Sequence, residues 1–98
     1  MPAYKEKFIN EITSKDSKVA VSGIIIDKED NLIFLDDGTG VMPISLETSL
    51  AVNTFVKVFG YIISNGDELQ LQGEVIQDLS NVNKKFYNKL KSLMNQKQ

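Results

Sequence analysis

Residues 55–78 have the sequence FVKVFGYIISNGDELQLQGEVIQD, which predicts a hairpin of two long β-strands. Asn65-Gly66 is the strongest short signal for the turn, because both residues tolerate the positive φ angles that a two-residue turn needs. Apolar residues alternate with polar ones after the turn, as in a strand with one buried face. Gly60 and Gly73 each interrupt a strand near its middle. Long strands that bend at a glycine are what a small closed barrel requires.

Three further strands precede this hairpin. KVAVSGIIID (18–27) is rich in β-branched residues and again has a central glycine, Gly23. LIFLD (32–36) and VMPISL (41–46) flank the tight-turn sequence Asp37-Gly38-Thr39-Gly40. Residues 47–53 predict a loop or a single helical turn. A β-sandwich would need more strands, whereas five strands with a connection between the third and fourth fit an OB-fold barrel.

Both ends of the chain predict helices. In residues 3–13, Tyr4, Phe8 and Ile12 lie four apart, which indicates a short amphipathic helix. A second helix is predicted over residues 82–95, with Asn81 as its N-cap. We therefore divide the chain into a helical lead-in (1–17), a barrel (18–79) and a C-terminal amphipathic helix (80–98).

The composition argues against catalysis. The chain of 98 residues has no Cys, His or Trp, so the commonest nucleophile, proton shuttle and transition-metal ligands are missing. The adjacent pair Asp36-Asp37 fits a turn, where Asp bonds its own backbone, better than a hydrolase site. We expect no enzyme, cofactor or metal. Because no apolar stretch spans a bilayer and no signal peptide is visible, we expect a cytoplasmic protein, or a nuclear one in a eukaryote.

Charge is unevenly distributed along the chain. Residues 79–98 contain five Lys and no acidic residue, whereas residues 1–78 contain the other six Lys and all thirteen acidic residues. The sequence therefore predicts an acidic barrel followed by a basic helix.

Four stretches resemble the OB-folds of replication protein A, particularly its middle and small subunits and their archaeal relatives. They are VAVSG (19–23), FLDDGTG (34–40), VKVFG (56–60) and ELQL (68–71). Telomere-capping subunits look similar, and the resemblance covers residues 12–78. It implies a non-catalytic subunit of a complex that handles single-stranded DNA in replication and repair. In that family, helices of different subunits bundle together and the smallest subunits act mainly as scaffolds.

The barrel itself is predicted to bind single-stranded DNA weakly. OB-folds grip a strand with a basic groove and aromatic platforms, but the turns at residues 27–30 and 64–68 each have a net charge of −2. Two platforms would supply about 2–6 kcal/mol, and thus at best tens of micromolar affinity. We expect Phe34 to fill the barrel and a terminal helix to cover the outer row of the fourth strand. The alternative is a nucleic-acid contact formed by Phe34, Lys57, Phe59 and Tyr61.

The C-terminal helix has several possible roles. It packs on its own barrel as a lid, bundles with partner subunits, or does both with different sides. Its lysine-rich face also suits DNA or an acidic surface, including the barrel of a second copy in a homo-oligomer. We favour a partner-binding helix, with the contact residues Val82, Phe86, Tyr87, Leu90, Leu93 and Met94.

Two other functions are compatible with the sequence. One is an OB-fold adaptor that binds another replication or repair protein, such as a DNA polymerase, and the acidic barrel favours it. The other is an RNA- or tRNA-binding module, which would predict basic loops, and these are absent from the sequence.

Overall fold

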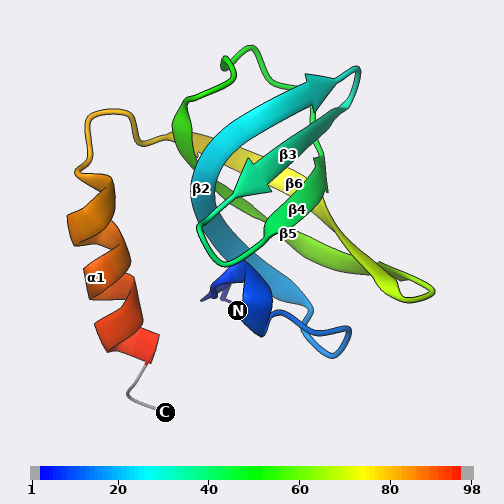
Figure 1. The fold of residues 1–98 in the computed structure, drawn as a ribbon. Helices are drawn as coiled ribbons and strands as arrows, with labels where there is room; N and C mark the ends of the chain where they lie inside the picture. Colours follow the sequence, from blue (N-terminus) through cyan, green and yellow to red (C-terminus); the bar gives the residue numbers. More distant parts are fainter. Residues whose placement is uncertain (1–2, 96–98) are drawn as a thin grey trace.

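The computed structural model describes residues 3–95 and shows a closed five-stranded barrel with one helix beside it (Figure 1). The barrel order is β2-β3-β4-β6-β5, and pairing of β5 with β2 closes it. All neighbours are antiparallel except β4 and β6. The predicted OB-fold barrel is therefore confirmed. Its strands are β2 (Lys18–Glu29), β3 (Leu32–Asp36), β4 (Val41–Ser45), β5 (Phe55–Asn65) and β6 (Glu68–Asp78).

Two of the central glycines lie where strands approach too closely for a side chain. β2 pairs with β5 through its first half and with β3 through its second half. At Gly23, where the partner changes, a Cβ atom would lie 2.5 Å from the carbonyl oxygen of Asp36. At Gly60, beside a register shift between β5 and β6, a Cβ atom would collide with the carbonyl oxygen of Gln72. Glycine at these positions is what permits the bend.

The core fills the barrel with aliphatic side chains from every strand and from the segment before β2. β-Branched residues dominate it, as expected for inward positions on bent strands. The core residues are Ile9, Ile12, Val19, Val21, Ile25, Ile33, Leu35, Met42, Ile44, Val56, Val58 and Leu71.

The predicted helix over residues 3–13 is wrong. Lys5–Glu6 forms β1, which pairs parallel to β2, and Ile9–Glu11 forms a single 3-10 turn. Long-range contacts outweigh the local periodicity here. The Tyr4 ring packs edge-on against Phe59 at 5.4 Å, whereas Ile9 and Ile12 enter the core.

The turn between β3 and β4 confirms the structural role expected for the two adjacent aspartates. Asp36 Oδ1 accepts a hydrogen bond from Gly38 N at 2.8 Å, and Asp37 Oδ1 accepts one from Thr39 N at 2.9 Å. The other oxygen of Asp37 accepts the backbone N–H of Ile9 at 2.7 Å. This carboxylate therefore fastens the N-terminal segment to the barrel.

The remaining helix, α1 (Lys84–Asn95), begins two residues later than predicted. Asn83 Oδ1 accepts the backbone N–H of Phe86 at 2.9 Å, so Asn83 caps the helix and the prediction of Asn81 is wrong. The connection between β4 and β5 is a loop without a helical turn, and it packs Leu46 and Leu50 against the core. No helix among residues 3–95 is long and apolar enough to cross a membrane.

Candidate binding surfaces

α1 leaves its apolar row largely exposed, although Leu90 borders a hollow against Glu6 and Lys57. Phe86 is 61% exposed, Leu93 51% and Leu90 44%. Val82 lies just before the helix and is also exposed. A helix of twelve residues is marginal alone and normally buries such a row. The side chain of Met94 lies outside the described part of the structure.

The side of α1 that adjoins this row contacts the barrel, mainly through Tyr87. The Tyr87 ring packs edge-on against Phe55 at 6.0 Å. The Tyr87 hydroxyl donates to Glu6 Oε1 at 3.0 Å and accepts from Ser22 Oγ at 3.3 Å. α1 therefore rests on the barrel through the side that adjoins its apolar row. Tyr87, predicted to contact a partner, contacts the barrel instead.

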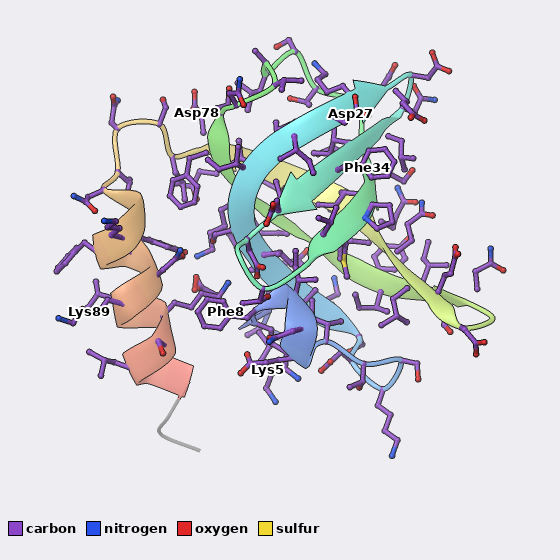
Figure 2. All side chains as sticks on the ribbon, viewed as in Figure 1. Lys5, Phe8, Asp27, Phe34, Asp78 and Lys89 are labelled. Atoms are coloured by element: carbon purple, nitrogen blue, oxygen red, sulfur yellow. The ribbon has the colours of Figure 1, made fainter. Side chains whose placement is uncertain are left out.

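One helical turn further on, Lys91 is buried against the N-terminal segment. It is 1% exposed, and its amine has no hydrogen-bond partner within residues 3–95. The amine lies 4.7 Å from the centre of the Phe8 ring, which points toward α1 (Figure 2). Burial lowers the pKa of Lys91, Lys57 adds to the effect, and the carboxylates of Glu6, Asp37 and Glu11 oppose it.

Because of this burial, we expect Lys91→Met to stabilise the docked helix by about 1–3 kcal/mol, the desolvation penalty of a buried polar group. The lowered pKa means that the unfolded chain binds the proton more tightly than the folded one. Stability is therefore expected to rise with pH between the folded pKa and about 10.4. Thermal unfolding at pH 7 and pH 9.5, followed by circular dichroism, measures both effects.

The exposed Lys89→Met is the matched control for this substitution, because Lys89 points away from the barrel (Figure 2). It should change stability by less than about 0.5 kcal/mol. A less stable Lys91→Met variant would show that the contact between the amine and Phe8 stabilises the fold, contrary to this expectation.

The outer row of β5 is covered by both termini. Val56 and Val58 point into the core, so Phe55, Lys57, Phe59 and Tyr61 face outward. Tyr87 of α1 covers Phe55, Tyr4 covers Phe59, and Lys57 forms an ion pair with Glu6. The predicted covering by a terminal helix is correct for the first part of the row. Tyr61 remains 41% exposed.

Phe34 lies outside the barrel, and the expectation that it fills the core is wrong. Residues alternate across a strand, and Ile33 and Leu35 take the inward positions of β3. Phe34 instead lies in register with Asp27 of β2 and Pro43 of β4. Because β2 separates β3 from β5, Phe34 and the β5 row belong to different surfaces. Their role in nucleic-acid binding stays a prediction.

A hollow of about 390 Å³ lies between α1 and the barrel, beside the β3–β4 turn. Its apolar wall is formed by Ile24, Ile26 and Phe55, and Asp36 and Asn88 line its other sides. The sequence indicates none of this, because the hollow depends on where α1 rests. The described residues contain no group of three or more acidic side chains placed to hold a metal ion.

Comparisons with protein-family models and with curated proteins found no match. Among solved structures, the chain is similar to telomere capping protein Ten1 from Saccharomyces pombe, with a TM-score of 0.81, 19% identity, and coverage of 96% of this chain and 99% of that chain. The chain has the OB fold. It is also similar to a chain of the S. pombe Stn1–Ten1 complex, with a TM-score of 0.82, 18% identity, and coverage of 99% and 96%.

A third similar structure is a replication protein A heterotrimer bound to single-stranded DNA. The TM-score is 0.69 at 15% identity, with coverage of 82% of this chain and 71% of that chain. The similarity to replication protein A and telomere-capping OB-folds that the sequence predicts is therefore confirmed as a likeness of fold.

Two site residues, Glu6 and Lys91, have no signal in the sequence. Glu6 accepts from both Lys57 and Tyr87 and so joins β1, β5 and α1. The parallel pairing of β1 with β2 cannot be read from the local pattern. The spacing of apolar residues in the helix predicts that Lys91 lies on a solvent-exposed side. In the structure the side with Lys91 is the one covered by the rest of the chain.

Proposed function

We propose that this OB-fold chain is a non-catalytic subunit of a replication protein A-like complex that binds single-stranded DNA, and that it acts mainly in assembly. The observation that carries this proposal is the exposed row Phe86, Leu90 and Leu93 on a helix that contacts the barrel through Tyr87. Partner-binding helices present apolar anchors three and four residues apart in this way.

The barrel has the wrong charge to grip a phosphate backbone alone. The β2–β3 hairpin exposes Asp27, Glu29 and Asp30 near its tip, and the β5–β6 hairpin exposes Asp67 and Glu68. Lys28 offers no compensation, because its amine donates to the carbonyl oxygens of Thr48 and Leu50. Since phosphate neutralisation supplies much of the affinity for DNA, this chain would depend on partner subunits for it.

Two of the similar structures are assemblies, the Stn1–Ten1 complex and the replication protein A heterotrimer bound to single-stranded DNA. Both support a place in a multisubunit complex. The exposed row on α1 is the surface through which we expect this chain to join one.

The test compares the isolated chain with the complex that co-purifies with a tagged copy of the chain after nuclease treatment. Anisotropy of a labelled single strand of roughly 30 nucleotides, a length that spans several OB domains, reports binding by each. The complex should bind at least about 100-fold more tightly than the chain, because the missing basic contacts come from its partners. Submicromolar, salt-sensitive binding by the isolated chain would contradict the assembly role. A purified complex that binds no DNA would overturn the function.

A further inference from the structure

The outer face of β2, β3 and β4 carries apolar side chains with aspartates among them, because Asp36 lies in register between Ile24 and Val41. Ile26 is 43% exposed and Val41 49%. Asp27, Asp30 and Asp36 lie along the strands or at their ends. We call this the acceptor surface, and its apolar members are Ile24, Ile26, Phe34, Val41 and Pro43.

The exposed side of α1 complements the acceptor surface in both polarity and charge. Lys85 and Lys89 are exposed and flank the row Phe86, Leu90 and Leu93. No acidic residue occurs anywhere in residues 79–98. One chain thus carries an apolar surface with a basic flank and an apolar surface that includes aspartates.

We propose that, in the absence of partner subunits, α1 of one copy docks on the acceptor surface of a second copy, and that the exchange is reciprocal. This goes beyond the proposed function, because it concerns the isolated chain and assigns a binding role to a second surface. Two-fold symmetry makes the interface isologous, because the helix row of each copy contacts the acceptor surface of the other.

Charge selects this arrangement over direct packing of two α1 helices. Two helices face to face would bring together Lys85 and Lys89 of both copies and no acidic residue. On the acceptor surface, the same lysines meet carboxylates. The hollow beside Ile24 and Ile26, about 390 Å³ in volume, has room for an anchoring side chain such as Leu90. Reciprocal docking forms the contact twice and so doubles the buried surface area, which favours a stable interface.

The experiment uses sedimentation velocity over a concentration series of the full chain and two single variants. Ile26→Lys places a charge on the acceptor surface, and Leu90→Glu places one on the helix row. Both side chains are exposed, so the fold should persist, which circular dichroism checks. The matched controls are Val75→Lys, at an exposed position of β6, and Ser92→Glu, at an exposed position of α1.

We expect the unmodified chain and both controls to dimerise from a monomer of 11.0 kDa, and added salt to weaken the dimer. Each single variant should weaken self-association at least about tenfold, as loss of a central contact does. An equimolar mixture of the two variants should dimerise again. In the mixed dimer, the unaltered helix row of Ile26→Lys meets the unaltered acceptor surface of Leu90→Glu. In the other contact, the carboxylate introduced by Leu90→Glu faces the amine introduced by Ile26→Lys.

Three results would overturn the proposal. They are a monomer at every concentration, a dimer unaffected by Ile26→Lys, and variants whose mixture stays monomeric. The second result would indicate packing of helix on helix. None of them bears on the proposed function, because binding of the partner subunit is measured separately.

Discussion

The double variant Phe86→Glu/Leu90→Glu is expected to lose about 1,000-fold in affinity for the partner subunit while its barrel stays folded. Central apolar anchors contribute about 2 kcal/mol or more each to an interface, and every 1.4 kcal/mol is tenfold in affinity. Both side chains are exposed in the isolated chain, at 61% and 44%, so their replacement removes no core contact. Calorimetric titration with the partner recovered from the complex measures the effect.

Two controls distinguish loss of the helix row from a general effect of added charge. Ser92→Glu introduces a carboxylate at an exposed position on another side of α1 and should leave affinity nearly unchanged. Ile26→Lys disturbs self-association only and should also bind the partner normally. If the double variant bound with full affinity, α1 would not be the docking element, and the acidic barrel would become the candidate surface.

The barrel is predictable from the sequence because its signals are local. Asn65-Gly66 predicts the hairpin by its backbone preferences, but the turn residues are Gly66 and Asp67, one position further on. Asn65 still pairs with Glu68, and Gly66 adopts a φ of 69°. Gly23 and Gly60 mark bends, because only a residue without Cβ fits where a carbonyl oxygen lies against the strand. Each of these signals operates within a few residues, so the chain itself carries it.

The errors share a different physical cause, which is competition from distant contacts. The spacing of Tyr4, Phe8 and Ile12 is helical, but pairing with β2 and burial of Ile12 outweigh it. Hydrophobicity alone places Phe34 in the core, although Ile33 and Leu35 take the inward positions. Composition cannot choose between the two faces of a strand when both carry apolar residues.

The site on α1 is half predictable for the same reason. The apolar row follows from its spacing of three and four residues, and the structure keeps it together and exposed. Which side of the helix meets the barrel depends on Glu6, Ser22 and Phe55, which contact Tyr87 from distant parts of the chain. The burial of Lys91 follows from that choice and has no local signal.

Gly60→Ala is expected to destabilise the barrel by about 3 kcal/mol or more, a large share of the stability of a small domain. The new Cβ would collide with the carbonyl oxygen of Gln72, and it would lie 2.9 Å from the carbonyl carbon of Gln72 and 3.0 Å from Gly73 Cα. These atoms belong to the backbone of β6, so no side-chain movement relieves the overlap, and β5 and β6 must separate. For a domain of this size, the midpoint of thermal unfolding should fall by more than about 10 °C.

The other glycines of the same hairpin provide a graded control. At Gly73 the nearest atoms belong to the side chains of Leu46, Ile44 and Val58, at 3.1–3.3 Å, so Gly73→Ala should be milder because side chains can shift. At Gly66 an added Cβ atom would have no atom within 4 Å apart from those of its chain neighbours, and asparagine tolerates the φ of 69°. Gly66→Asn should therefore be nearly neutral. Equal losses of stability at all three positions would indicate a general effect of removing glycine. Losses that decrease in the order Gly60, Gly73, Gly66 would locate the constraint where β5 lies against the backbone of β6.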